Sequence, residues 1–297
     1  MSTLTKTKAP VAAANIKKKS QFQEVWGRFK KNWMAVGGLI LIVIMMVVCL
    51  LSPFIAPHHY DAQNYYETFQ SPSFQHFCGT DNLGRDIFSR LLYGGRVSLF
   101  IGLISVGIGL ACGGTIGAIA GYFGGKLDNI LMRGIDILMA IPSIVLGISI
   151  CAALGPGLIN TMIAVGISTI PNYTRILRSA IMSIKQQEFV EAAKAIGASD
   201  KRIILKHIIP NSLSGIIVQA SMGVGRAIIS AASMSFVGLG IQPPNPEWGA
   251  MLSAGRTYFR DYPHMVLFPG VAIFLAVLSM NLIGDGLRDA MDPKLKR

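Results

Sequence analysis

Residues 34–56 read MAVGGLILIVIMMVVCLLSPFIA and carry no charged side chain. A helix needs about 20 mainly apolar residues to cross the hydrocarbon core of a bilayer. The stretch therefore predicts a membrane protein whose first span lies here. No small-residue cleavage site precedes Pro57, so we expect an uncleaved anchor rather than a signal peptide that is removed.

The composition of the chain agrees with a membrane location. Of its 297 residues, 52% are hydrophobic and only 14% are charged, against about 25% charged in soluble domains. So few charges could not cover the surface of a soluble protein, which argues against an aqueous enzyme. The net charge of +12 is concentrated beside apolar segments, so membrane topology explains it, and we expect no nucleic-acid partner.

Five more apolar stretches follow the first. They cover residues 97–125, 131–153, 158–174, 213–239 and 264–285. Loops rich in Lys and Arg stay in the cytoplasm, and 21 of the 27 basic residues lie in the two tails and in two alternate loops. The pattern predicts an all-α polytopic protein of the cytoplasmic (inner) membrane, with about six transmembrane helices and both termini inside.

These spans divide the chain into five parts. The expected parts are a cytoplasmic tail (1–33), the first transmembrane helix (34–56), an extracytoplasmic loop (57–96), a five-helix core (97–285) that includes a cytoplasmic loop (175–211), and a cytoplasmic C-terminal tail (286–297).

Two features of the spans have more than one interpretation. A glycine recurs at every fourth residue from Gly109 to Gly125, a spacing that allows close approach either within one bundle or to a second membrane subunit. Charged residues inside a membrane are functional candidates. Arg133 and Asp136 are spaced to pair on one helix, whereas Arg226 lies alone; Asp136 and Arg226 are our candidates for a translocation pathway.

The cytoplasmic loop 175–211 is patterned like a folded unit. Phe189, Ala193 and Ile196 recur at helical spacing and Gly197 follows as a helix end. Ser199 or Asp200 can begin a second helix, which carries Ile203, Ile204 and Ile208 and which Pro210 is expected to end. A helix-turn-helix on the cytoplasmic side is suited to docking on a partner.

This loop resembles the EAA loop of ABC-type importer permeases. Glu191, Ala192 and Ala193 match the three initial residues, and Gly197, Ile209 and Pro210 follow at positions of the pattern EAA-x3-G-x9-I-x-L-P. The sequence departs from that pattern at two places, with His207 for isoleucine and Ile209 for leucine. In this family the loop is the coupling helix that docks on an ATPase subunit.

The resemblance extends over nearly the whole chain. GTDNLGRD (79–86), GYFGG (121–125), PEWG (246–249) and GDGLRD (284–289) look like the second, C-type permease subunit of dipeptide and oligopeptide importers. Nickel and glutathione importers share most of these motifs. The resemblance therefore implies a peptide cargo, with nickel or glutathione as alternatives.

The extracytoplasmic motifs are candidate contacts for a delivering protein. Asp81, Arg85 and Asp86 could meet a substrate-binding protein, or they could form an internally salt-bridged cap on the bundle. Trp248 is expected at the membrane interface, with a short helix packed over the outer mouth.

The resemblance also implies the partners. They are a second homologous permease in a heterodimer, two P-loop ATPase subunits, an extracytoplasmic binding protein, the peptide substrate and membrane lipid. Because the chain lacks a P-loop and any catalytic constellation, we expect ATP and Mg²⁺ only on the partners. We expect no metal site either, since the four cysteines and five histidines have no ligand spacing. An ion-coupled carrier or a channel remains as an alternative of another class.

Overall fold

The computed structural model describes residues 21–291, and nearly all of their regular structure is helical. The helices are α1 (Gln21–Phe29), α2 (Trp33–Leu50), α3 (Ser52–Ile55), α4 (Ile87–Phe123), α5 (Gly125–Met139), α6 (Ser143–Leu154), α7 (Leu158–Lys185), α8 (Glu188–Ala195), α9 (Asp200–Ile203), α10 (Ile209–Phe236), α11 (Trp248–Gly255) and α12 (His264–Met291). Residues 1–20 and 292–297, which include most of the two predicted tails, lie outside the described part.

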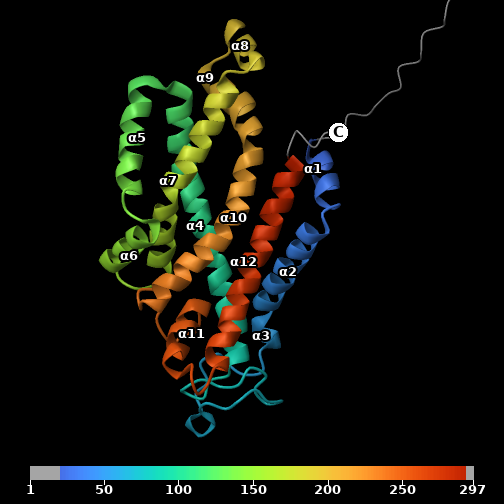
Figure 1. Cartoon of the computed structure of the whole chain (residues 1–297), viewed down its shortest axis with the longest axis vertical. Coiled ribbons are helices and arrows are strands. Elements are labelled where there is room, and N and C mark those ends of the chain that lie inside the picture. Colours follow the sequence, from blue (N-terminus) through green and yellow to red (C-terminus); the bar gives the residue numbers. More distant parts are fainter. Residues whose placement is uncertain (1–20, 292–297) are drawn as a thin grey trace, which may run out of the picture.

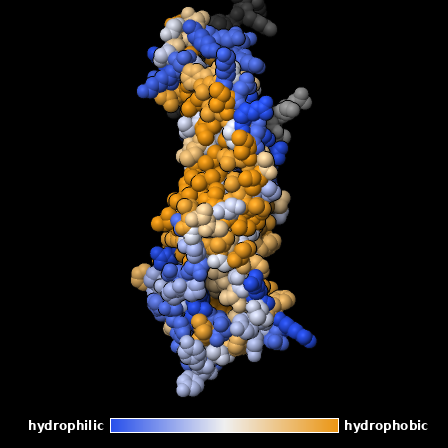
Figure 2. All heavy atoms as spheres, turned by 90° about the vertical axis from the view of Figure 1, so that its left-hand side faces the viewer, coloured by the Kyte–Doolittle hydropathy of each residue, from blue (hydrophilic) through white to orange (hydrophobic). Residues whose placement is uncertain are grey.

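The long helices run along the long axis of an elongated molecule (Figure 1). Figure 2 shows a hydrophobic band across the middle of one face, with hydrophilic residues gathered at both ends. Such a band matches the hydrocarbon core of a bilayer. One end carries α1, α8 and α9 together with the last described turn of α12, and the other carries the loop before α4 and helix α11 (Figure 1). Both described ends of the chain therefore lie on the same side.

Four helices in the described part are long and apolar enough to cross a membrane. They are α2, α4, the continuous segment 200–236 and α12, and the α5–α6 pair would make a fifth span. α7 runs lengthwise from the level of α6 to α8 (Figure 1) but does not meet the same criterion. It buries polar side chains such as Thr161, Ser168 and Thr174 because it packs inside the bundle.

The predicted third span is broken in the structure. α5 and α6 meet at an angle of 85°, and Pro142 stands directly before α6. Proline has no N–H to donate and disfavours a helical conformation at the residue before it. The predicted span 131–153 is therefore made of parts of two helices and not of one.

Other helix ends also differ from the predicted ones. α4 begins ten residues before the predicted span, at Ile87, because the Asp86 side chain accepts a hydrogen bond from Ser89 N at 2.7 Å and caps the helix. The first span ends at Leu50 and continues as the short helix α3. The fourth runs on to Lys185, so part of the predicted loop 175–211 is helical bundle.

The glycine stripe packs α4 against α7 of the same chain. A Cβ atom added to Gly113 or Gly117 would lie 2.5 Å from a backbone oxygen of α7, Ile170 O and Thr174 O respectively. Gly109 and Gly121 also face α7, whereas Gly125 faces open space. For the first four glycines, the interpretation as packing within one bundle is confirmed.

The short helix expected over the outer mouth is α11, but Trp248 does not lie at the surface. The indole is 1% exposed, and its Nε1 donates a hydrogen bond to Leu91 O at 3.0 Å. The expectation of an interfacial aromatic was wrong because α11 folds back onto α4, where the buried indole N–H finds an acceptor.

Candidate functional site

The candidate coupling segment, residues 186–210, stands at the end of the molecule opposite the outer loop (Figure 1). α8 is a helix of eight residues, as its pattern predicted. It buries Val190 and Ala193 in a small core with isoleucines from α7, α9 and the turn that follows α9. The predicted apolar face was wrong in part: Phe189 is 38% exposed and Ile196 is 85% exposed.

Gly197 ends α8 as the sequence predicted. Its φ angle is +76°, and a Cβ atom there would meet nothing within 4 Å, so the need for glycine comes from the backbone. Gly197 N donates to Lys194 O at 2.9 Å, and Ala198 N donates to Ala193 O at 3.1 Å. This pair of bonds is the Schellman motif, in which a left-handed residue closes a helix.

The second helix of the segment begins at Asp200, as expected, but does not end at Pro210. A π-helical turn, Ile204–Ile208, joins α9 to α10, and Pro210 lies in the first turn of α10. Ile209 N donates to Ile204 O, five residues back, which widens the helix just before the proline. Such a bulge accommodates the missing N–H and the ring, so the helix continues into the membrane.

Tyr122, at the end of α4, holds the segment in place. Its hydroxyl donates to the Asp200 carboxylate, and the Lys185 ammonium lies 5.5 Å from the centre of its ring. Tyr122 belongs to the GYFGG motif, for which no role was predicted. A tyrosine next to glycines at the end of a helix does not indicate, from the sequence alone, that its hydroxyl reaches Asp200.

The matched EAA residues divide between surface and core. Glu191 and Ala192 are exposed, Ala193 is buried, Ile209 is half-buried and Pro210 is exposed. Glu191 and Ile196 therefore present one charged and one large apolar side chain to the outside of the segment.

Arg226 lines a cavity of about 330 Å³ between α7, α10 and the α5–α6 break. Its lining mixes apolar side chains with polar ones, among them Ser168, Asn172 and Tyr173. Asp136 is not among the lining residues. The two pathway candidates are thus not brought together in this cavity.

Asp136 pairs with a different arginine from the one that spacing suggested. Arg175 Nη2 on α7 lies 2.6 Å from Asp136 Oδ1, so the predicted pair with Arg133 was wrong. Nearby, Arg178 makes two hydrogen bonds of 2.6 Å to the Asp128 carboxylate. Two arginines of α7 thereby hold α5, which sequence spacing within one helix could not reveal.

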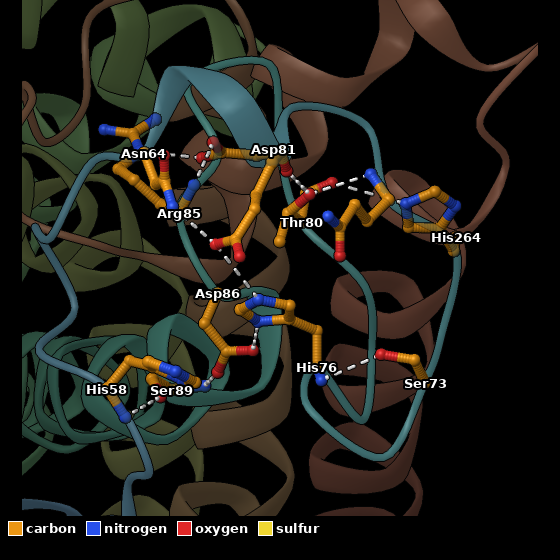
Figure 3. A network of polar contacts seen from close by, with 12 residues as sticks. His58, Asn64, Ser73, His76, Thr80, Asp81, Arg85, Asp86, Ser89 and His264 are labelled. Atoms are coloured by element: carbon orange, nitrogen blue, oxygen red, sulfur yellow. Dashed lines mark hydrogen bonds and ion pairs between the residues drawn. The ribbon is translucent and has the colours of Figure 1, made fainter.

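The outer residues Asp81, Arg85 and Asp86 lie inside the loop before α4 (Figure 3). Asp81 accepts a hydrogen bond from Arg85 Nε at 2.7 Å and others from Leu83 N and Arg85 N. Their burial favours the internally salt-bridged cap over direct contact with a binding protein. Exposed aromatic side chains of the same loop are available instead, with Tyr66 and Phe74 each 99% exposed.

The loop also brings together groups that the sequence analysis kept apart. His76 Nδ1 lies 2.9 Å from Asp86 Oδ1, and the ring of His58 stacks on that of His76 with centroids 4.9 Å apart (Figure 3). Separations of many residues hid this cluster.

Two family models match the chain. Residues 113–297 match the family described as binding-protein-dependent transport system inner membrane component. Residues 20–72 match the N-terminal transmembrane domain of oligopeptide transport permease C.

Two named permeases align with most of the chain. It is 47% identical over 277 residues to the dipeptide transport system permease protein DppC of Alkalihalophilus pseudofirmus, covering 93% of this chain and 91% of that protein. It is 48% identical over 281 residues to the glutathione transport system permease protein GsiD of Escherichia coli, covering 94% and 92%.

The fold also matches solved structures of the methionine ABC transporter MetNI in inward-facing conformations. The TM-score is 0.58 at 20% identity, over 68% of this chain and 97% of that chain. At this identity the likeness concerns the fold.

Proposed function

Because the chain belongs to the family of binding-protein-dependent transport system inner membrane components, we propose that it is the permease subunit that carries short peptides through an ABC importer. The family is one of ABC importer permeases, multi-pass proteins of the inner membrane. An ion-coupled carrier or a channel is set aside on that ground.

A peptide cargo is supported by the names of the relatives. Dipeptides and glutathione, itself a tripeptide, are the substrates that those names give. The cavity beside Arg226 supports the same proposal, because a guanidinium among hydroxyl, amide and phenol groups can bind a peptide carboxylate by donating hydrogen bonds to it. Arg226 is our residue for the pathway; Asp136, paired with Arg175, holds helices together. The alternative cargo is nickel.

The proposed energy source is a pair of ATPase subunits that bind the ATP and Mg²⁺, one docked on residues 186–210 of this chain and the other on the matching loop of the second permease. The observation that carries this proposal is that Ile196 and the charged Glu191 are both exposed at the tip of a well-packed segment. A large apolar side chain in water at such a tip is typical of a contact surface. Movement of the ATPases acts on the bundle because α9 runs through the π-helical turn into α10.

The other proposed partners follow from the two faces of the bundle. A second, homologous permease completes the pathway as a heterodimer, and lipid covers the remaining hydrophobic band. An extracytoplasmic binding protein docks on the outer loop, where Tyr65, Tyr66 and Phe74 are exposed. Aromatic residues are enriched at such interfaces.

Charge reversal at Glu191 tests the coupling proposal. We expect Glu191→Lys, and separately Ile196→Asp, to lose the ATPases when the tagged permease is purified in mild detergent, and to lose ATP-driven dipeptide uptake. Lys126→Glu is the matched control, because Lys126 is exposed at the same end of the molecule but on α5. The amount of inserted protein should be the same in all variants. Full ATPase recovery and uptake in both tip variants would contradict the proposal.

A further inference from the structure

Three potential metal ligands meet on the outer side of the bundle. One ligand atom each from His58, His76 and Asp86 lies within 4.8 Å of the other two (Figure 3). His58 follows α3, His76 lies in the loop, and Asp86 is the first cap of α4. Two imidazoles and one carboxylate are a donor set that Zn²⁺ accepts in proteins.

The spacing of the donors is compatible with a shared ion. His76 Nδ1 and Asp86 Oδ1 are 2.9 Å apart. Ligand atoms that each lie about 2.0–2.2 Å from a tetrahedral zinc ion are separated by roughly 3.4 Å, so these two atoms would move apart by about half an ångström to hold the ion. The present distance of 2.9 Å suits a hydrogen bond, so a proton or, after this small opening, a metal ion can occupy the position between the two atoms.

Each donor is held by a neighbour. Asp86 Oδ2 accepts from Ser89 N at 2.7 Å, which leaves Oδ1 facing His76. Ser89 Oγ in turn accepts from His58 N at 3.2 Å. Ser89 therefore holds both the backbone of His58 and the carboxylate of Asp86.

The other ring nitrogen of His76 faces a second carboxylate. His76 Nε2 lies 3.7 Å from Glu67 Oε2, and the same oxygen accepts from Asn64 Nδ2 at 2.7 Å. Histidine ligands of metals usually donate their remaining N–H to a carboxylate, which fixes the ring and strengthens the ligand. Glu67 is placed for that role.

The site is also accessible. His76 and Asp86 are buried while His58 is exposed, so the third donor closes the cluster from the solvent side. Three protein donors leave a position for water, as in zinc sites with an open coordination position.

We propose that His58, His76 and Asp86 bind a divalent transition-metal ion of the zinc class. The ion joins the segment after the first membrane span to the start of α4. His58 falls within residues 20–72, the part that matches the N-terminal domain model, so the ion fastens that domain to the core of the permease. This site is separate from the proposed pathway and does not depend on the nature of the cargo.

Adjacent histidines provide a matched test. His58 and His59 are both exposed, but only His58 belongs to the cluster. The full chain is purified in detergent with a tag that contains no histidine, stripped with EDTA and equilibrated with Zn²⁺. We expect one tightly bound zinc ion per chain in the parent and in His59→Ala. We expect at least about tenfold weaker binding in His58→Ala.

A second readout guards against misfolded variants. Zinc should raise the thermal unfolding temperature of the parent and of His59→Ala, because a ligand that binds only the folded state stabilises it, and at the same zinc concentration should raise that of His58→Ala by less. Glu67→Gln should weaken binding without abolishing it. Absence of stoichiometric zinc on the parent, or equal binding by the His58 and His59 variants, would overturn the proposal.

Discussion

Gly107 and Gly113 lie on the same helix, α4, in different surroundings. A Cβ atom at Gly113 would lie 2.5 Å from Ile170 O, whereas one at Gly107 would meet nothing within 4 Å. A backbone oxygen inside a packed helix cannot move aside cheaply, so we expect Gly113→Ala to destabilise the protein by about 1–3 kcal/mol. Gly107→Ala should be neutral or stabilising by up to about 1 kcal/mol. Thermal unfolding in detergent compares the two, and equal effects would contradict the assigned packing.

Arg226 is the residue on which the pathway proposal makes its sharpest prediction. We expect Arg226→Ala to reduce dipeptide uptake by about tenfold to a hundredfold, the effect of losing a charge-assisted hydrogen bond worth about 1.5–3 kcal/mol. Expression and ATPase co-purification should not change. Arg133→Ala is the control, because Arg133 is also an exposed arginine of the bundle but is not among the residues that line the cavity. Unchanged uptake in Arg226→Ala would remove Arg226 from the pathway.

Single residues were predictable from sequence where a local rule decides them. Gly197 is such a case, since a left-handed helix end requires glycine whatever the rest of the fold does. The partner of Asp136 was not predictable, because Arg175 lies on another helix and spacing identifies only neighbours on the same one. Trp248 was misplaced for a similar reason: its burial depends on α4, about 150 residues earlier in the sequence, whose Leu91 O accepts its N–H.

At the scale of elements, Glu247 shows how a short helix is attached to the bundle. The side chain is 1% exposed and caps α11, accepting from Gly249 N at 2.9 Å and Ala250 N at 2.8 Å. It also accepts from Ser98 Oγ of α4 at 3.0 Å. One carboxylate therefore both begins α11 and ties it to the longest membrane helix.

Replacing this cap should loosen α11. We expect Glu247→Ala to cost about 1–3 kcal/mol, because it leaves buried donors without an acceptor. Glu247→Gln should cost less, since the amide keeps one oxygen and the size of the side chain. Thermal unfolding gives the order, with Ala254→Ser, at an exposed position of the same helix, as a nearly neutral reference. A Glu247→Ala variant as stable as the reference would show that the cap is dispensable.

The number of membrane spans was predicted from the sequence better than the shape of each span. Apolar length reveals a span but not a bend. Pro142 marks where the helix breaks, whereas the 85° angle between α5 and α6 also depends on how each of them packs on α7. The π-helical turn before Pro210 was equally hidden. A proline normally signals a helix end, and only the wider turn preceding it lets α10 continue.

At the scale of the whole molecule, the basic residues predicted that both tails lie on the side of residues 186–210. The described ends of the chain do lie at that end of the bundle (Figure 1). The predicted side of each tail depends on the sum of many basic residues and on the number of spans. Errors of a few residues in the helix boundaries therefore leave this prediction unchanged. The outer loop was the least predictable region, since its network is built from contacts between separate segments such as Thr80 with Gln70 and His264.

The orientation in the membrane can be measured on intact cells with a membrane-impermeant maleimide. Ser71 lies in the outer loop and Gln186 between α7 and α8, and both are exposed. We expect Ser71→Cys to react in intact cells, and Gln186→Cys to react only after the membrane is made permeable. The background from the loop's own cysteine should be low, because burial raises the pKa of the Cys78 thiol to about 11. At pH 7 almost all of this thiol is protonated, and the reactive thiolate is scarce. The reverse labelling pattern would place residues 186–210 outside the cell, where no ATPase could reach them, and would contradict both the topology and the coupling proposal.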